Sequence, residues 1–104
     1  MAKRLVWSPI AKAIRKEILQ YWIRRNKSKR YSKKLNTLFE ESAQQIADFP
    51  YSGISISGKI YRGKLVKDYY LLYKIKDDSI EILFIWDTRK DPADLLNLVK
   101  NFSK

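Results

Sequence analysis

Apolar residues recur at helical spacing in the first half of the chain and at strand spacing in the second half. Between Ile10 and Trp22 they fall three or four residues apart, which predicts an amphipathic helix. Residues 31–46 repeat the pattern, and a second helix should end just before Pro50, because the residue before a proline resists the helical conformation. We therefore expect two adjacent helices with a short link, which form an antiparallel hairpin.

Polar residues and prolines mark the expected starts of the helices. Residues 8–9 are Ser-Pro, which predicts a helix start because serine is a favoured N-cap and proline suits the first helical position. Ser28 can cap the second helix. Residues 91–92 are Asp-Pro, and the same argument predicts a short third helix there. The apolar triplet at residues 5–7 predicts a strand before the first helix.

Short β-rich segments follow the second helix. We expect strands at residues 54–57, 59–66, 69–75 and 80–86. Gly63 interrupts the second of these strands and predicts a bulge there. The last strand is apolar at nearly every position, which is typical of a central strand that is covered on both faces.

These elements predict an α+β fold with an N-terminal strand, a two-helix hairpin, a sheet and a short C-terminal helix. The antiparallel two-helix hairpin should pack on one face of a three- to four-stranded antiparallel sheet. The other face should be partly open, with the last helix near it. The length of 104 residues is that of one domain, so we expect a single domain over residues 1–104.

Charge is the most unusual feature of the composition. The chain has 22 lysines and arginines against 11 acidic residues, a net charge of +11, which favours association with a polyanion or an acidic partner. A merely solvated basic surface is the alternative. The chain contains no cysteine and no histidine, so we expect no thiolate chemistry, no metal and no cofactor. No apolar run approaches the roughly 20 residues of a spanning helix, so we expect a cytoplasmic protein without a membrane partner.

The end of the last strand offers a first set of candidate residues. Continued alternation would place Leu83, Ile85, Asp87 and Arg89 on one side, and Ile82, Phe84, Trp86 and Thr88 on the other. Arg89 could clamp a phosphate, because its planar fork makes two hydrogen bonds to one phosphate group. Asp87 could orient Arg89 or act as a base, and Lys90 adds a further cation. The alternative is that this pair only stabilises the loop before the last helix.

A second set of candidates lies on the neighbouring strands. Arg62, Lys64 and Lys67 form a basic cluster that could bind phosphate, or that could simply keep an outer strand edge solvated. Tyr70 could stack on a base or supply a proton, whereas Tyr69 and Tyr73 are expected in the core. Metal-independent cleavage of RNA on such a surface needs a base, cations and an acid for the leaving oxygen. The sequence offers the cations more clearly than the acid.

Four segments together resemble the RelE/ParE family of bacterial toxins from type II toxin–antitoxin pairs. They are VWSPIAKAIRKEI, SKRYSKKLNTLFEESAQQIADFP, DYYLLYKI and IEILFIWDTRKDP. The resemblance covers essentially the whole chain, and the last two segments at this spacing are its most specific part. It implies a compact α/β toxin whose sheet carries the active face, and an acidic or amphipathic antitoxin that wraps the toxin and neutralises it.

The family divides into two modes of action. RelE-like members cut messenger RNA in the ribosomal A site, and ParE-like members poison DNA gyrase. The resemblance implies that Arg89 takes the place of the strand-end arginine of the nucleases, with Arg62 and Lys64 near their other catalytic cations. We expect the other candidates named above, Lys67, Tyr70, Asp87 and Lys90, to bind the substrate.

Two departures from the nuclease pattern keep both modes open. The nucleases commonly carry arginine at the position of Tyr70, and a tyrosine or histidine near the C-terminus. Here neither residue type follows Tyr73. We expect ribosome-dependent mRNA cleavage by a metal-independent endoribonuclease, with the ribosome and mRNA as partners. The alternative is a non-enzymatic inhibitor that binds DNA gyrase.

Overall fold

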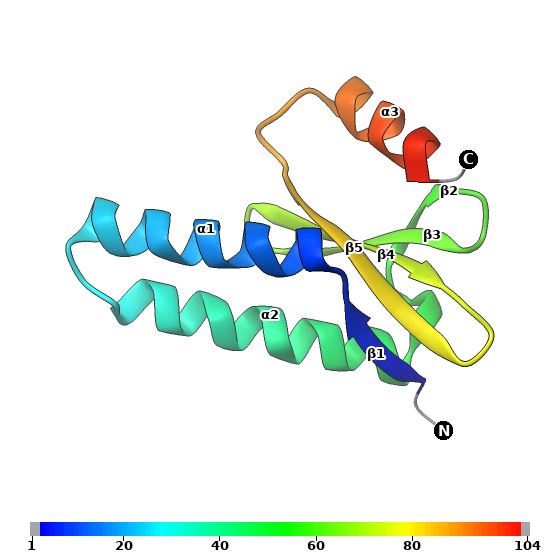
Figure 1. The fold of residues 1–104 in the computed structure, drawn as a ribbon, viewed down its shortest axis with the longest axis horizontal. Helices are drawn as coiled ribbons and strands as arrows, with labels where there is room; N and C mark the ends of the chain where they lie inside the picture. Colours follow the sequence, from blue (N-terminus) through cyan, green and yellow to red (C-terminus); the bar gives the residue numbers. More distant parts are fainter. Residues whose placement is uncertain (1–2, 103–104) are drawn as a thin grey trace.

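The computed structural model describes residues 3–102, and its elements follow the predicted order (Figure 1). They are β1 (Arg4–Trp7), α1 (Pro9–Asn26), α2 (Arg30–Asp48), the 3₁₀ turn η1 (Pro50–Ser52), β2 (Ile54–Ser57), β3 (Tyr61–Val66), β4 (Tyr69–Ile75), β5 (Ser79–Asp87) and α3 (Pro92–Phe102). The predicted α+β class is confirmed, with its N-terminal strand, helical hairpin, sheet and short C-terminal helix.

The five strands form one sheet in the order β1-β5-β4-β3-β2. The pairs β2–β3, β3–β4 and β4–β5 are antiparallel, as expected. Strand β1 adds a fifth member, and it runs parallel to β5, so that Leu5 lies opposite Ile80. The two strands are far apart in the chain, with the α1–α2 hairpin and strands β2 to β4 between them, which provides the long connection that parallel neighbours need.

Apolar side chains cover both faces of the sheet. On one face, Leu35 and Phe39 of α2 pack against Tyr73 of β4 and Ile82 of β5. On the other face, α3 packs through Leu95 and Val99 on a second cluster. That second cluster takes its sheet residues from β3, β4 and β5, namely Tyr61, Leu72, Leu83 and Trp86. Strand β5 therefore contributes to both clusters, and its expected central position is confirmed.

A bulge in β5 changes the expected alternation of its side chains. Leu72 of β4 lies opposite Phe84, but Tyr73 lies opposite Ile82, so Leu83 is an extra residue. Leu83 consequently joins Trp86 on the α3 side, and Ile82 joins Ile85 on the hairpin side. The expectation that Leu83 shares a side with Ile85, and Ile82 a side with Trp86, was wrong because one extra residue reverses the order of the two faces.

The expectation of a bulge at Gly63 was also wrong. Strand β3 pairs with β4 without interruption from Tyr61 to Val66, and the irregularity lies on β2 between Ser55 and Ser57. Gly63 serves a different purpose, because a Cβ at this position would lie 3.3 Å from Ile56 Cδ1. The glycine thus lets Ile56 pack closely over β3.

The expected helix starts are confirmed at α1 and corrected at α2. Ser8 Oγ accepts a hydrogen bond from the backbone N–H of Ala11 (3.0 Å) and donates one to the Leu83 carbonyl (3.0 Å), which ties α1 to β5. The N-cap of α2 is Lys29 rather than Ser28, and Lys29 makes no side-chain capping bond. Ser28 Oγ accepts instead from the N–H of Arg30 (3.2 Å).

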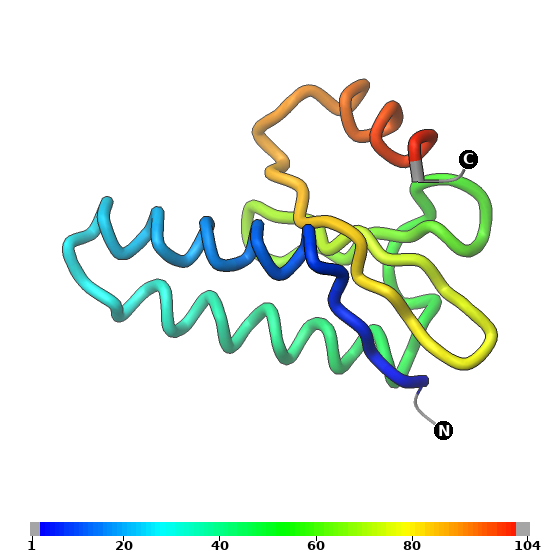
Figure 2. Tube along the Cα trace, in the orientation of Figure 1, coloured from blue at the N-terminus to red at the C-terminus, as the bar shows by residue number. Residues whose placement is uncertain are grey.

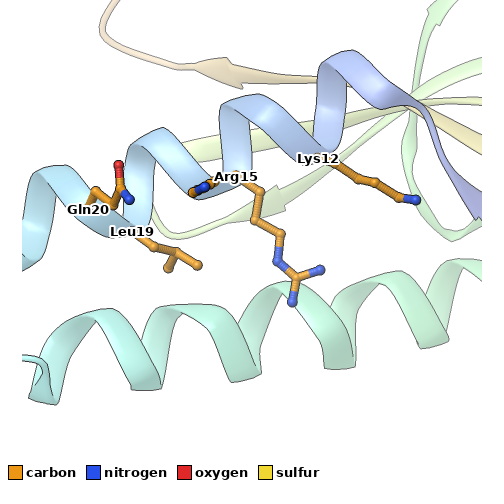
Figure 3. Close-up of a pocket in the computed structure, with 5 residues that line it drawn as sticks. Lys12, Arg15, Leu19 and Gln20 are labelled. Carbon is orange, nitrogen blue, oxygen red and sulfur yellow. The ribbon is translucent and has the colours of Figure 1, made fainter.

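Arg15 joins the two helices of the hairpin. Its side chain reaches from α1 toward α2 (Figure 3), where Nε donates to Asn36 Oδ1 (2.8 Å) and Nη2 contacts Glu40 Oε1 (2.8 Å). The guanidinium also lies 4.7 Å from the centre of the Trp7 ring. One cation therefore connects α1, α2 and β1 at the side of the hairpin.

The Tyr73 hydroxyl holds the segment between α2 and β2. It donates to the Pro50 carbonyl (2.6 Å) and accepts from the Gly53 N–H (3.1 Å). Burial raises the pKa of Tyr73 above its usual value of 10.0, so the phenol stays protonated at neutral pH. A Cβ at position 53 would lie 2.6 Å from this oxygen, which explains why a glycine stands there.

We predict that Tyr73→Phe lowers the free energy of unfolding by about 1–3 kcal/mol, because it leaves the buried Gly53 N–H without its acceptor. The measurement is denaturant unfolding followed by circular dichroism. Tyr70→Phe is the matched control, since the half-buried Tyr70 hydroxyl has no hydrogen-bond partner within residues 3–102. A loss of similar size in both variants would contradict this account of Tyr73.

Candidate functional site

Asp87 and Arg89 form a closed ion pair where β5 ends. Arg89 donates from Nε to Asp87 Oδ1 (3.0 Å) and from Nη2 to Oδ2 (2.8 Å), and its backbone N–H also donates to Oδ1 (2.9 Å). Hydrogen bonding from Arg89 holds the pKa of Asp87 below its usual value of 3.8, against the opposing effect of burial. Asp87 is therefore an ionised partner of Arg89, poorly suited to take up a proton at neutral pH.

The loop beyond β5 is anchored to the neighbouring turn. Thr88 donates from its Oγ1 (2.8 Å) and its backbone N–H (2.9 Å) to the Asp68 carbonyl, and the Lys90 N–H donates to the Asp87 carbonyl (3.1 Å). Sequence reasoning did not single out Asp68, because its role depends on a backbone carbonyl rather than on its side chain. These bonds fix the direction in which Arg89 leaves the sheet.

Arg62 is hydrogen-bonded to backbone carbonyls near the β2 edge of the sheet. Its guanidinium donates to the carbonyls of Gly53 (3.0 Å), Lys59 (3.2 Å) and Tyr51 (3.4 Å), and it lies 5.3 Å from the centre of the Tyr51 ring. Five N–H donors are available to an arginine, so these bonds take up much of its capacity. Arg62 therefore holds the β2 region in place.

The remaining predicted residues are distributed over both faces and a turn. Lys64 lies two positions along β3 from Arg62, half-buried, and its ammonium has no partner within residues 3–102. Tyr70 lies on the opposite, α3-side face, where it packs against the second apolar cluster. Lys67 is exposed in the β3–β4 turn, in a left-handed conformation with φ of 56°.

The strand register separates the two arginines. Asp87 lies opposite Tyr69, and Tyr69 lies opposite Val66 of β3. Val66 is four residues beyond Arg62, about 13 Å along the strand, and two strand spacings add about 10 Å across the sheet. The backbones at Arg62 and Asp87 are thus roughly 16 Å apart by this geometry, and each arginine is held by its own local partners. The structure does not bring Arg62 and Arg89 together around one phosphate.

An apolar groove beside Asp87 was missed by the sequence reasoning. It has a volume of about 450 Å³ and is lined by Ile10, Ile14, Glu17, Ile18, Tyr69, Phe84, Ile85, Asp87 and Lys90. Ile10 is 53% exposed here, although it belongs to the apolar stripe of the first helix. Helical spacing identifies the apolar face of a helix. It does not show which residues of that face the sheet covers and which lie beyond the edge of the sheet.

Within residues 3–102, no group of three or more His, Asp or Glu residues could hold a metal ion. The predicted cations that this surface can offer to a phosphate are Arg62, Lys64, Lys67, Arg89 and Lys90. Among the helices described, none is both long enough and apolar enough to cross a membrane.

Comparison with known proteins points to one family. A family model described as the ParE toxin of the type II toxin–antitoxin system parDE matches residues 5–92. A solved chain of the chromosomal ParDE toxin–antitoxin system from P. aeruginosa is similar in structure, with a TM-score of 0.69 and 16% identity. The match covers 83% of this chain and 96% of that chain, and at this identity it shows a shared fold. In sequence, no protein of curated function matches the chain.

We predict that Arg89→Ala raises the pKa of Asp87 toward its usual value, because the largest cause of the lowered value is the side-chain hydrogen bond from Arg89. The measurement is an NMR pH titration of the Asp87 carboxyl carbon. Since the folded pKa lies below the unfolded one, the pair stabilises the fold above about pH 4 and loses this contribution as the pH falls. Lys90→Ala, which removes only a weaker charge effect, should move the pKa less; an equal shift in both variants would refute the assignment.

Proposed function

Because the chain belongs to the ParE toxin family of type II toxin–antitoxin systems, we propose that it inhibits growth by binding DNA gyrase rather than by cutting messenger RNA. Membership of this family makes the protein a toxin that is paired with an antitoxin. Gyrase as the target is the part that we propose. A toxin with this target acts in the cytoplasm, where gyrase and its DNA are found.

The separation of Arg62 from Arg89 is the observation that carries this proposal. A nuclease needs its cations around the phosphate whose charge grows in the transition state. Here Arg62 is bonded to the carbonyls of Gly53 and Lys59, and Arg89 is bonded to Asp87. To serve one phosphate, each guanidinium would have to leave a set of good hydrogen bonds.

The shortage of side chains that could transfer a proton also favours gyrase inhibition over RNA cleavage. Cleavage of RNA needs a base for the 2′-hydroxyl and an acid for the leaving oxygen. Asp87 is held ionised by Arg89, and Tyr73, the last tyrosine in the chain, is buried with its hydroxyl committed to Pro50 and Gly53. Tyr70 remains, and it lines a pocket of about 300 Å³ together with Lys64, but its ring packs on the α3 side of the sheet, on the opposite face from Arg62. A toxin that acts by binding alone needs none of these groups.

We predict that the purified toxin inhibits supercoiling of a relaxed plasmid by gyrase in a concentration-dependent manner. In parallel, mapping of 5′ ends after induction of the toxin in a bacterium should show growth arrest without new cuts inside translated codons. Relaxation of the supercoiled form of the same plasmid by a type I topoisomerase is the control, because that reaction uses the same DNA without gyrase.

Two results would overturn the proposal. Supercoiling that continues unchanged at high toxin concentration would remove gyrase as the target. New mRNA cuts within codons would restore the ribonuclease hypothesis, and loss of those cuts in Arg89→Ala would then assign Arg89 to the reaction.

The antitoxin is the second partner, and the groove beside Asp87 suits it. An amphipathic helix binds by placing an apolar face in a groove of this kind, and charged residues at the rim set its orientation. The groove offers Ile10, Ile14 and Phe84 as apolar wall, with Lys90 at the rim. With a net charge of +11 on the toxin, an acidic antitoxin would be attracted at long range.

We predict that Ile10→Glu weakens binding of the antitoxin encoded beside the toxin by about 10- to 100-fold, the usual cost of losing an apolar anchor. The measurement is titration of the purified toxin with that antitoxin. Ile60→Glu is the matched control: Ile60 is 40% exposed and lies outside the groove. Equal affinities for the two variants would place the antitoxin elsewhere.

A further inference from the structure

The turn of the helical hairpin carries a concentrated positive charge that neither proposed site uses. We call residues 24–34 the hairpin tip. It contains the seven cations Arg24, Arg25, Lys27, Lys29, Arg30, Lys33 and Lys34, and all seven are exposed. No acidic residue occurs between Glu17 and Glu40. The tip lies at the far end of the hairpin, away from α3 and both termini (Figure 2).

Nothing in the described part of the protein neutralises this charge. Within residues 3–102, none of the seven side chains forms an ion pair, whereas Arg15, Lys76 and Arg89 each have an acidic partner. On α2, Arg30, Lys33 and Lys34 stand three and four residues apart, so these like charges repel one another on one helix face. Repulsion of this kind destabilises the folded chain, and an external polyanion would relieve it.

The tip also goes against the usual rules for helix ends. Arg24 and Arg25 suit the C-terminal end of α1, where cations offset the helix dipole. Lys29 and Arg30 do the opposite, because they add positive charge at the N-terminal end of α2, where no acidic residue occurs in the first turn. Lys27 adopts a left-handed φ of 52°, a conformation that favours glycine. Positions that break several local rules together are often functional sites.

We propose that the hairpin tip binds the phosphate backbone of double-stranded DNA. The inference goes beyond the proposed function, because it concerns DNA itself and not the gyrase protein. Duplex DNA carries about one negative charge per 1.7 Å of its axis, and lysines and arginines that neutralise its phosphates release counterions. The first-turn N–H groups of α2 lie at the same end of the helix as these cations and add to their attraction for an anion.

The surroundings of the tip argue against other partners. A protein partner needs an apolar anchor, and no large apolar side chain is exposed between Tyr21 and Phe49. A single strand needs exposed rings on which its bases stack. Tyr31, the ring within the tip, lines a shallow pocket there but is half-buried and packs edge-on against Trp22 at 5.0 Å. Tyr21, the nearest exposed ring, lies outside the tip and also packs edge-on against Trp22, at 5.1 Å. Residues 24–34 thus present cations without an exposed large apolar side chain, which suits a duplex backbone.

The inference predicts a specific salt dependence. Binding of the whole toxin to a short labelled DNA duplex would be followed by fluorescence anisotropy at several concentrations between about 50 and 200 mM salt. In the triple variant Arg30→Gln, Lys33→Gln, Lys34→Gln, the slope of log K against log salt should fall in magnitude by up to about 2.7, which is about 0.9 for each phosphate that is no longer neutralised. Glutamine keeps a high helix propensity, so α2 should remain folded.

A matched variant separates the tip from net charge. Lys12→Gln, Lys16→Gln and Lys59→Gln together remove the same charge from exposed positions outside the tip, and should change the slope by less than about 1. Thermal unfolding by circular dichroism checks that both variants are folded. Equal slopes for the two variants, or tighter binding of an RNA of the same length at matched salt, would overturn the inference. Gyrase is absent from this assay, so DNA binding and gyrase inhibition can fail independently.

Discussion

Strand β5 has to bury side chains on both faces of the sheet, and this requirement determines where the other elements lie. The α1–α2 hairpin covers Ile80, Ile82 and Ile85 on one side, and α3 covers Leu83 and Trp86 on the other. The extra residue at Leu83 puts Ile82 and Ile85 on the hairpin side and Leu83 and Trp86 on the α3 side, three residues apart in each case, which strict alternation would not allow. Strand β5 is also paired with β4 from Ile80 to Asp87 and with β1 from Ser79 to Ile82. The polar residues of this strand lie toward its two ends: Ser79 and Glu81 near the start, where Glu81 pairs with Lys76, and Asp87 at the last position.

The same requirement explains why the cations of the sheet do not gather into one site. The sheet has the order β1-β5-β4-β3-β2, so its candidate cations stand on β3, next to the edge strand β2, and beyond the end of β5. Arg89 leaves the sheet at one end of β5 and binds Asp87, while Arg62 occupies β3 toward the opposite end and binds three carbonyls. Each guanidinium is satisfied by nearby oxygens, which lowers its energy in the free protein and weakens any gain from an added phosphate. Binding to a protein target does not need these groups to be released.

The sequence predicted the elements well because their signals are local. The Ser-Pro start of α1, the proline after α2 and the continuous apolar run of β5 each depend on a few neighbouring residues. The features that were wrong or missed depend on register and on distant partners. The bulge at Leu83 is set by packing on two faces at once, and the role of Arg62 depends on carbonyls nine and eleven residues away in the chain. The candidate cations were thus identifiable by residue type, but their separation across the sheet was not.

The apolar groove and the basic tip follow one another along α1. The groove is lined from Ile10 to Ile18 and the tip begins at Arg24, so the gap between them is six residues, about 9 Å along a helix. The Debye length is about 8 Å at physiological ionic strength, so a charge bound near Ile10, about 21 Å from Arg24, is largely screened from the tip, whereas one bound near Ile18 is screened less. A partner in the groove would therefore leave the charge of the tip exposed unless it also extended along the hairpin. A short antitoxin segment could block the groove while the tip still held DNA, whereas a segment long enough to reach the tip would have to carry acidic residues to match it.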